Sequence, residues 1–490
     1  MSVLKTKVIP QIKKINIFDG AVWLAILLVN IFGLILCFNR VYGYDEAYTV
    51  ALAGKSIREI IEATSQDVHT PFYYIVIHLL CGLTGVPILF MTKFLSLIFY
   101  DLYLWVGCTF IREIYDRKVS GYWLLFSALM PPMVIQVANG RMYTMGLFFV
   151  TASIVLAYKC YTENRWRDWV LLTLSSACGV YVHTFTMIAL FLVYVLLAVV
   201  IVGKKKYSQL RGYLLSGGTV ALVYLPWLVV LYHQMARWSG YEEGWSNTLP
   251  PVSLSEMKLW VYEWFSIMER PQIGALVFGI ALLIFSLYHT IRYSLTSKDV
   301  KPFVGIGIGT LIVVIAIVIG LTIVPCFYGR YIFCLFGAIY LLFAVGLRQC
   351  SAKWLQTVIC IGLFIVGAFA IADKQDLDKT DGLKQYQQFM DKFLEEDDII
   401  MCDTYFGFVM SIYYPDNEYM IYGSKPSSIP FECTVFTSWD QLEGVDDFWY
   451  IQLEGLRAGD LSAQFEEWDC LRFEHSHYTI LLKQMVRKTE

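Results

Sequence analysis

Side chains able to do acid–base chemistry gather in one stretch of the sequence. Asp45 and Glu46 are neighbouring carboxylates that follow directly after the first long apolar segment. About twenty residues later, Asp67 and His69 stand just before a proline and three aromatic residues (DVHTPFYY, 67–74). Carboxylates can act as general bases, and carboxylates with an imidazole can bind a divalent cation. A catalytic site is therefore one interpretation of this stretch.

The same residues also have plainer interpretations. Asp45 and Glu46 could cap a helix that lies along a membrane surface. Asp67 stands before a proline that is well suited to begin a helix, and an aspartate there is a common helix cap. The spacing alone leaves these alternatives open.

Two arginines, each followed closely by a tyrosine, stand at the ends of apolar segments. Arg141 lies in the segment NGRMY, with Tyr143 two residues later, and Arg330 directly precedes Tyr331. The planar guanidinium binds phosphate well, because it presents several donors in a fixed geometry. An arginine at a helix end is more often an anchor that reaches the membrane surface.

Three other features carry weaker signals. His183 ends an apolar segment, and such a histidine more often makes a structural hydrogen bond than a catalytic contact. The loop Arg237–Arg270 is rich in tryptophan and tyrosine, which could stack on sugar rings, although an interfacial anchor is the favoured interpretation. Lys93 and Asp101 are charges within one apolar segment, and they mark either a buried polar pair or helix-end groups.

The composition indicates a membrane protein. Of 490 residues, 57% are hydrophobic and 16% are charged, against about 25% charged in soluble domains. A helix needs about 20 apolar residues to cross the bilayer. Eleven segments meet this need: 20–38, 88–110, 119–138, 142–160, 168–184, 186–203, 212–232, 272–292, 302–324, 328–347 and 354–372.

The distribution of positive charge predicts the orientation. Residues 71–85 are apolar but too short to span, so we expect them to lie in the interface. Nearly every Lys/Arg cluster then falls on one side of the membrane, as the positive-inside rule predicts, whereas the Lys204–Lys206 run would face outward if residues 71–85 crossed. We therefore expect a cytoplasmic N-terminus, no cleaved signal peptide, and an outward-facing first loop over residues 39–87.

The net charge of −3 conceals two regions of opposite sign. Residues 373–490 hold 24 acidic and 10 basic residues, whereas residues 1–372 hold 17 acidic and 28 basic residues. A basic membrane body with an acidic tail excludes a nucleic-acid binder, a disordered protein and a disulfide miniprotein. The tail contains short strand-like runs separated by helical stretches, which predicts a small extracytoplasmic α/β domain. One disulfide among Cys402, Cys433 and Cys470 is possible there.

Taken together, these motifs resemble one family. The carboxylates of the first loop, the DVHTPFYY segment and the two arginine–tyrosine motifs are similar to the membrane glycosyltransferases of the GT-C fold, in particular glycosyltransferase family 39. That family includes protein O-mannosyltransferases and aminoarabinose transferases. The resemblance covers residues 20–350. It departs at Thr70, where the family usually has a first proline, and at Asn139-Gly140, where it commonly has Glu-Ala.

The resemblance implies a function. An integral-membrane hexosyl- or pentosyltransferase would move a sugar from a polyprenyl phosphate to an envelope acceptor (glycan, lipid or protein) on the outer face of the plasma membrane, with inversion. Asp45 would be the base and Glu46 would assist it. The donor phosphate and substrate would be bound by the remaining candidate residues: Arg141, Tyr143, Arg330, Tyr331, Asp67, His69 and His183. Asp67 and His69 would shape the site or hold a divalent cation, Mg²⁺ or Mn²⁺, if one is used.

Two other classes of function compete with this one. A lipid or solute transporter would also have many spans, but its ionisable residues should lie near the midplane and its halves should repeat. In this sequence the carboxylates gather at the predicted outer surface, and the halves do not match. A catalytically inactive scaffold is the third possibility, and the presence of Asp45, Glu46, Arg141 and Arg330 argues against it.

Overall fold

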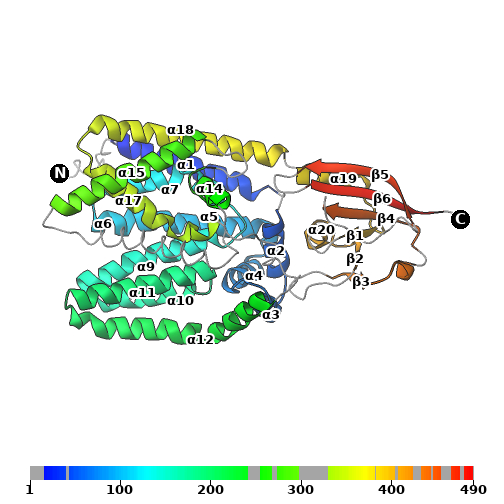
Figure 1. Ribbon diagram of the computed structural model, residues 1–490, viewed down its shortest axis with the longest axis horizontal. Helices are drawn as coiled ribbons and strands as arrows, with labels where there is room; N and C mark the ends of the chain where they lie inside the picture. The colour runs from blue at the N-terminus through cyan, green and yellow to red at the C-terminus, as the bar shows by residue number, and fades with distance from the viewer. Residues whose placement is uncertain are drawn as a thin grey trace, which may run out of the picture.

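The protein consists of a long helical body with a small sheet domain at one end (Figure 1). A computed structural model describes residues 16–39, 43–240, 254–266, 273–296, 329–380, 382–402, 407–422, 432–442, 445–453, 465–474 and 479–488. The expected combination of a polytopic helical membrane body and a small C-terminal α/β domain is confirmed.

The body is built from α-helices together with short π and 3₁₀ segments. They are α1 (Ile17–Cys37), α2 (Tyr44–Ala53), α3 (Ile57–Gln66), α4 (Phe72–Thr84), α5 (Ile88–Val106), η1 (Gly107–Ile111), α6 (Arg112–Ile114), α7 (Arg117–Leu129), α8 (Pro131–Gln136), α9 (Tyr143–Glu163), α10 (Trp166–Gly179), α11 (Thr184–Gly203), η2 (Tyr207–Gln209), α12 (Leu210–Gly240), α14 (Leu254–Phe265), α15 (Ile273–Thr296), η3 (Gly329–Leu335), α17 (Phe336–Gln349) and α18 (Lys353–Thr380).

Eight helices among the described residues are long and apolar enough to cross a membrane. They are Ile17–Cys37, Ile88–Ile114, Tyr143–Glu163, Thr184–Gly203, Tyr207–Gln234, Ile273–Tyr293, Gly329–Gln349 and Lys353–Asp376. Each coincides with one of the eleven expected spans.

The three other expected spans have different outcomes. The segment 119–138 forms two helices, because the residue before a proline favours an extended backbone and α7 ends just before Met130. The segment 168–184 contains the 14-residue α10, which is shorter than a full span. The segment 302–324 lies outside the described residues. Helix α4 has only 13 residues, in agreement with the expectation that 71–85 does not span.

Burial separates central helices from peripheral ones. In the most apolar 18-residue stretch of α9, 89% of the residues are buried inside the protein. In the corresponding stretch of the helix formed by η3 and α17, 83% are buried. In α12 and α18 the shares are 22% and 17%, and their outer surfaces present leucine, isoleucine and phenylalanine side chains. Such an apolar exterior is suited to lipid rather than water.

Three short helices, α2, α3 and α4, form the end of the body that faces the sheet domain (Figure 1). Helix α3 is amphipathic and begins with a reciprocal capping box, in which the Ser56 hydroxyl accepts from the Glu59 N–H and the Glu59 carboxylate accepts from the Ser56 N–H. Helix α4 ends at Gly85, whose φ of 72° requires a residue that tolerates the left-handed region. These caps stabilise the ends of α3 and α4, which are both too short to span a membrane.

The C-terminal domain contains one mixed sheet. Its elements are α19 (Gly382–Phe393), β1 (Ile399–Cys402), α20 (Gly407–Tyr413), β2 (Glu418–Tyr422), β3 (Thr434–Phe436), η4 (Trp439–Leu442), β4 (Asp447–Leu453), β5 (Phe465–Glu474) and β6 (Thr479–Arg487). The strand order is β3-β2-β1-β4-β6-β5, in which β3 to β4 are parallel and β6 is antiparallel to both neighbours. No disulfide joins Cys402, Cys433 and Cys470 in the described part of the chain.

The domain is packed onto the body rather than merely tethered to it. Helix α18 continues past the expected boundary at residue 372 and ends at Thr380. Helix α20 lies against α2, and one hydrophobic cluster joins side chains of α2 and α4, such as Leu52 and Tyr74, to Met410 and Ile421 of the domain. A shared core of this kind couples the position of the domain to that of α2.

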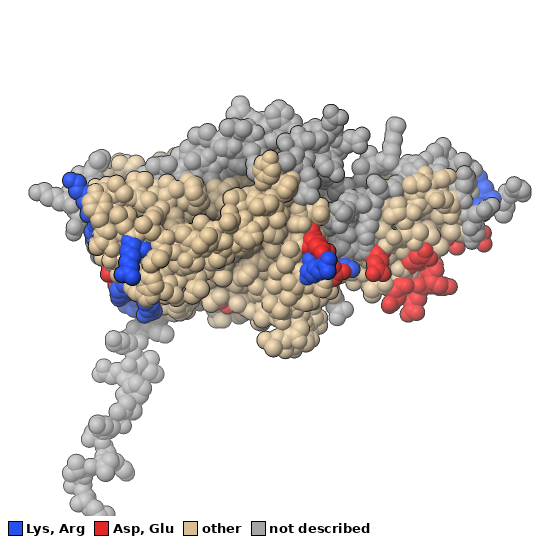
Figure 2. All heavy atoms as spheres, turned by 90° about the horizontal axis from the view of Figure 1, so that it is seen from below, with Lys and Arg blue, Asp and Glu red and all other residues tan. Residues whose placement is uncertain are grey.

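Opposite charges mark the two ends of the protein. On the face shown in Figure 2, most Lys and Arg side chains lie at the end of the body away from the sheet domain, whereas most Asp and Glu side chains lie on the sheet domain. Ion pairs join helix ends at the basic end: Arg348 Nε lies 2.8 Å from Asp116 Oδ2, and Lys159 Nζ lies 2.8 Å from Glu113 Oε2. This segregation is the pattern on which the predicted orientation depends.

Candidate functional site

Asp45 lies in the first turn of α2, at the end of the body beside the sheet domain. Gly43 is the N-cap residue and makes no side-chain cap, so neither Asp45 nor Glu46 caps the helix. Asp45 keeps 42% of its side chain exposed, and its Oδ2 lies 3.3 Å from Nη2 of Arg330. Residues 285 positions apart in the sequence are thus brought into an ion pair at an accessible place.

The neighbouring Glu46 has a different environment. Its Oε1 accepts a hydrogen bond of 2.7 Å from the Gly140 N–H, and its Oε2 lies 3.9 Å from Lys93 Nζ. Lys93 is 5% exposed and also donates to the Asn39 carbonyl at 3.1 Å. Lys93 therefore forms a buried polar contact with Glu46 of the site. Glu46 joins α2 to the loop that precedes α9.

Arg141 is buried at the centre of the site. It is 3% exposed, and its Nη1 donates to the Asp45 carbonyl at 3.0 Å and to Thr49 Oγ1 at 3.2 Å. Its Nη2 lies 3.2 Å from His69 Nε2. Burial opposes its charge, but Tyr74 and Asp45 outweigh that effect and raise the pKa of the guanidinium. The side chain fastens α2 to the loop that contains His69.

This contact determines the protonation of His69. A guanidinium has donors only, so this contact favours a neutral ring in which Nε2 accepts the hydrogen bond. Burial, the largest effect, lowers the pKa of His69, which favours the same state. Asp67 Oδ2 lies 3.8 Å from Nε2 of the same ring.

Two residues that the sequence did not single out hold these loops. The buried Ser96 hydroxyl lies 2.5 Å from the Asn139 carbonyl and 3.1 Å from the Arg141 carbonyl. Gln234, a 5% exposed residue in the C-terminal part of α12, donates from Nε2 to the Thr64 carbonyl at 2.9 Å and to the Asp67 carbonyl. Neither residue belongs to a recognisable motif, so only the tertiary structure reveals them.

Arg330 lies in the tight turn of η3, and its side chain is 30% exposed. The Trp264 indole N–H donates to the Gly329 carbonyl at 2.9 Å. A Cβ at position 329 would collide with the Glu263 carboxylate, so glycine allows this close approach. Glu263 also interacts electrostatically with Arg330 and with Tyr143. Glu263 is thus a second carboxylate near Arg330. In the sequence, its only distinguishing feature is that it is an acidic residue within an aromatic run.

Aromatic side chains form one wall of the site. The His183 ring lies 6.2 Å from Tyr143 and 5.2 Å from Tyr331, measured between ring centroids. His183 is the N-cap of α11, where its Nδ1 accepts from the Phe185 N–H at 3.2 Å. Burial, as the first cause, lowers the pKa of His183 to about 3. A neutral histidine that caps a helix matches the structural interpretation favoured from the sequence.

Comparison with solved structures identifies the fold. ArnT from Cupriavidus metallidurans in the apo state superposes with a TM-score of 0.65 at 10% identity, over 96% of this chain and 98% of ArnT. ArnT bound to undecaprenyl phosphate gives a TM-score of 0.64 at 11% identity, over 95% and 98%. AglB, the oligosaccharyltransferase of Archaeoglobus fulgidus, gives 0.50 at 13% identity, over 82% of this chain and 64% of AglB. Both neighbours have the GT-C fold. This chain has the GT-C fold.

No protein-family model matches the chain, and no curated protein matches it in sequence. The GT-C fold nevertheless accounts for the placement of the site. Helices α2 to α4 belong to the first long loop, and they bring Asp45, Asp67 and His69 against the starts of α9 and η3.

The divalent cation considered from the resemblance does not fit the residues present. Asp67 and His69 are two ligands, and the described residues contain no group of three or more His, Cys, Asp or Glu able to hold a metal. The Nε2 atom of His69 is already engaged by the Arg141 guanidinium, which would also repel a cation.

The aromatic loop 237–270 is described over residues 237–240, which end α12, and over α14 and Ser266. Trp260 and Phe265 are 6% and 7% exposed and pack into the body, and Trp264 holds Gly329. Within α14, Trp260 and Trp264 thus lie beside Gly329 at the Arg330 turn, whereas Phe265 packs beside Gly279 of α15.

Proposed function

We propose that this GT-C protein is an inverting glycosyltransferase that moves a sugar from a polyprenyl-phosphate donor to an envelope acceptor. The observation that carries the proposal is the pairing of an accessible carboxylate, Asp45, with a partly exposed arginine, Arg330. A base and a phosphate-binding cation are the two groups that this chemistry needs side by side. The neighbours ArnT and AglB, which have been solved with undecaprenyl phosphate and a dolichol-phosphate respectively, support this class of donor.

In this mechanism Asp45 removes the proton from an acceptor hydroxyl. The hydroxyl oxygen bonds to the anomeric carbon as the bond from that carbon to the phosphate oxygen breaks. The polyprenyl phosphate leaves with the electron pair of the broken bond, and Arg330 stabilises its charge. Attack from the face opposite the leaving group inverts the anomeric centre.

The ion pair between Asp45 and Arg330 suggests how binding of the donor could activate the base. A guanidinium beside a carboxylate favours the ionised carboxylate and makes it a weaker base. A donor phosphate that drew Arg330 away would strengthen Asp45 as a base once the donor is bound. The exposed fractions of both side chains, 30% and 42%, leave room for this exchange.

The remaining residues support these two. Arg141 and His69 hold α2 and the 67–71 loop together, and Glu46 fastens α2 to Gly140. Tyr143, Tyr331 and His183 form the wall near Arg330, where we propose that they contact the sugar. We assign Arg141 a positioning role, because its guanidinium is buried and donates to groups of the protein itself.

We propose that the basic end of the body faces the cytoplasm and that the site and sheet domain lie outside. The gathering of Lys and Arg away from the sheet domain supports this orientation. The lipid tail of the donor would lie against the apolar exterior of the body, and the sugar would be a hexose or pentose.

Asp45→Asn tests the proposal directly. Purified protein in nanodiscs, given a radiolabelled polyprenyl-phosphate sugar and native membranes as acceptor source, should lose transfer by two or more orders of magnitude while its thermal unfolding is unchanged. Glu466→Asn, an exposed residue of β5, is the control and should keep full activity. Normal transfer by a folded Asp45→Asn protein would reject the role of Asp45. Movement of lipid across liposomes without transfer would favour a flippase instead.

A further inference from the structure

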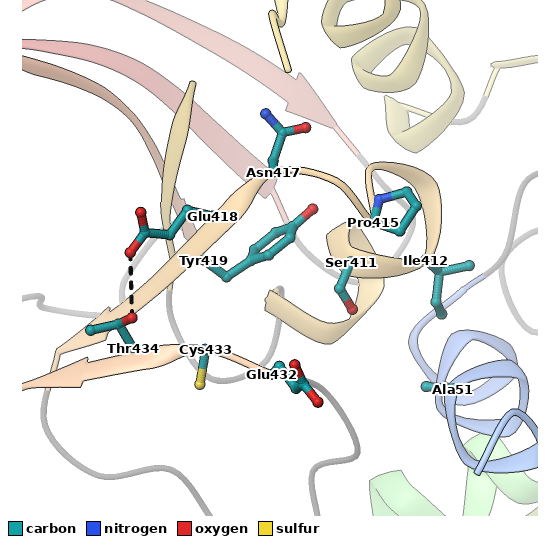
Figure 3. A pocket seen from close by; sticks show the side chains of 10 residues that line it. All are labelled: Ala51, Ser411, Ile412, Pro415, Asn417, Glu418, Tyr419, Glu432, Cys433 and Thr434. Carbon is teal, nitrogen blue, oxygen red and sulfur yellow. Dashed lines mark hydrogen bonds between the residues drawn. The ribbon is translucent and has the colours of Figure 1, made fainter. Parts of the chain in front are cut away.

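A cavity of about 600 Å³ lies at the seam between α2 and the C-terminal domain. It is bounded by Ala51 of α2, by Ser411 and Ile412 of α20, and by the segment from Glu432 to Thr434 at β3 (Figure 3). The volume falls within the range of small-molecule binding sites. Asp45 and Arg330, which form the candidate active site, are not among its lining residues.

The chemistry of the lining is one-sided. It offers oxygen acceptors from Glu418 and Glu432 and a hydroxyl group from Thr434, and its described lining contains no Lys, Arg or His. Such a surface repels phosphate and carboxylate groups and favours ligands rich in hydrogen-bond donors. Ile412 and Pro415 add apolar surface beside the oxygen atoms.

The orientation of the side chains agrees with this chemistry. The Glu432 carboxylate reaches into the space between β3 and Ala51, and the Ser411 hydroxyl points into the same space (Figure 3). Asn417 points away, because its amide donates to the carbonyls of Glu395 and Asp398 at 2.7 and 3.0 Å. Thr434 Oγ1 lies 3.4 Å from Glu418 Oε1, a long hydrogen bond that a ligand hydroxyl could replace.

The seam also lies close to the proposed base. Ala51 and Asp45 stand six residues apart on α2, which is about 9 Å along the helix at 1.5 Å per residue. Helix α20 packs on α2, and both contribute to the cluster that joins domain and body. A ligand in the seam would therefore touch the element that presents Asp45.

We propose that this seam cavity binds a saccharide segment of the acceptor, either neutral or bearing an amine, through Glu418, Glu432 and Thr434. The proposal rests on the proposed glycosyl transfer and deepens it, because it assigns a carbohydrate acceptor. The acidic domain then acts as a recognition module for the molecule that receives the sugar.

The binding test uses the full-length protein in nanodiscs and three trisaccharides of different charge. Neutral chitotriose and its deacetylated, amine-bearing counterpart should bind in isothermal titration calorimetry, whereas anionic trigalacturonic acid should not. The double variant Glu418→Gln/Glu432→Gln should weaken binding at least tenfold. The matched control Glu396→Gln/Glu466→Gln removes two exposed carboxylates that do not line the cavity, and it should bind normally.

A second variant tests the cavity with a smaller change, so that weaker binding cannot be attributed to misfolding. Thr434→Val changes one exposed hydroxyl at nearly constant shape and should weaken binding by a factor of a few with an unchanged unfolding temperature. Equal binding of all three saccharides, or no binding of any, would overturn the proposal. Binding of an extended Ser/Thr-containing peptide in their place would identify a peptide site along edge strand β3 and would overturn it as well.

Transfer kinetics separate this proposal from the proposed function. With native membranes as acceptor source, Glu418→Gln/Glu432→Gln should raise the acceptor amount needed for half-maximal rate at least fivefold, while the KM for the donor stays constant. Activity lost by Asp45→Asn but unaffected by the seam variants would reject the seam and keep the transferase. Saccharide binding at the seam without transfer would reject the transferase and keep the seam as a saccharide site.

Discussion

Two arginines of the site, Arg141 and Arg330, have similar sequence surroundings but opposite environments. Arg141 is 3% exposed and donates to three groups of the protein itself. Arg330 has a side chain that is 30% exposed and is paired with a carboxylate that is itself accessible. An arginine whose donors are all directed inward builds a site, whereas one at the surface of a site is available to a ligand. The comparison divides the candidate residues into a scaffold and a pair, Asp45 and Arg330, that we propose to react.

The largest expected effect is on folding, from Arg141→Ala. Three acceptors in a buried region would lose their charged donor, which should lower the free energy of unfolding by roughly 3 kcal/mol or more. Thermal unfolding in nanodiscs measures this, with Arg58→Ala on exposed α3 as the control. A stable Arg141→Ala protein that had lost donor binding would make Arg141 a phosphate ligand and end the contrast.

The next effect is on donor binding, from Arg330→Ala. Loss of a charge-assisted hydrogen bond to phosphate should cost about 1.5–3 kcal/mol, or about 10- to 150-fold in donor affinity, without unfolding the protein. Arg348→Ala, at the opposite end of the body, is the control and should bind donor normally. Unchanged donor affinity in Arg330→Ala would remove Arg330 from the reacting pair.

A smaller effect is expected from Gln234→Leu, which tests the scaffold at a distance from the charges. The variant loses both hydrogen bonds to the loop that contains Asp67, so kcat should fall by roughly 5- to 30-fold, equivalent to about 1–2 kcal/mol. The KM for the donor should change little, because Arg330 is untouched. A rise in donor KM with constant kcat would show that the loop contacts the donor instead.

The smallest effect concerns pH. The pKa of His183 is lowered to about 3 by burial, so the folded protein binds fewer protons than the unfolded chain below about pH 6.5. Its contribution to stability is complete above that pH and declines as the pH falls, by about 1 kcal/mol between pH 7 and 5.5. His183→Asn keeps a helix cap and should flatten the pH dependence of chemical unfolding. An equally steep dependence in the variant would assign the effect to other groups.

Much of the fold was predictable because length and hydrophobicity act locally. The eight long helices and the short α4 follow from the number of consecutive apolar residues. The division of segment 119–138, which was expected to be one span, was not predicted, although its local cause, Pro131, is present in the sequence. The number of spans was harder to predict, because an apolar segment can form a helix such as α10, whose 14 residues are fewer than a full span needs.

The candidate site was predictable as a set of residues but not as a set of contacts. Asp45, Asp67, His69, Arg141 and Arg330 are recognisable because charged side chains are rare next to apolar segments. Glu263 and Gln234 are not recognisable, since a single polar residue near a helix end has many ordinary explanations. Their importance arises from interactions between residues far apart in the sequence: Glu263 acts electrostatically on Arg330, 67 residues away, and Gln234 hydrogen-bonds to Thr64, 170 residues away.

The sequence by itself determined that this is a basic, multi-span helical body joined to an acidic α/β domain, and which charged residues could act. Hydropathy and charge are additive properties of segments, so they can be read without knowledge of the fold. The tertiary structure decided that Arg141 is buried while Arg330 meets Asp45, and that the acidic domain shares a core and a cavity with α2. Burial and pairing depend on which segments become neighbours, and packing of the whole chain is what brings them together.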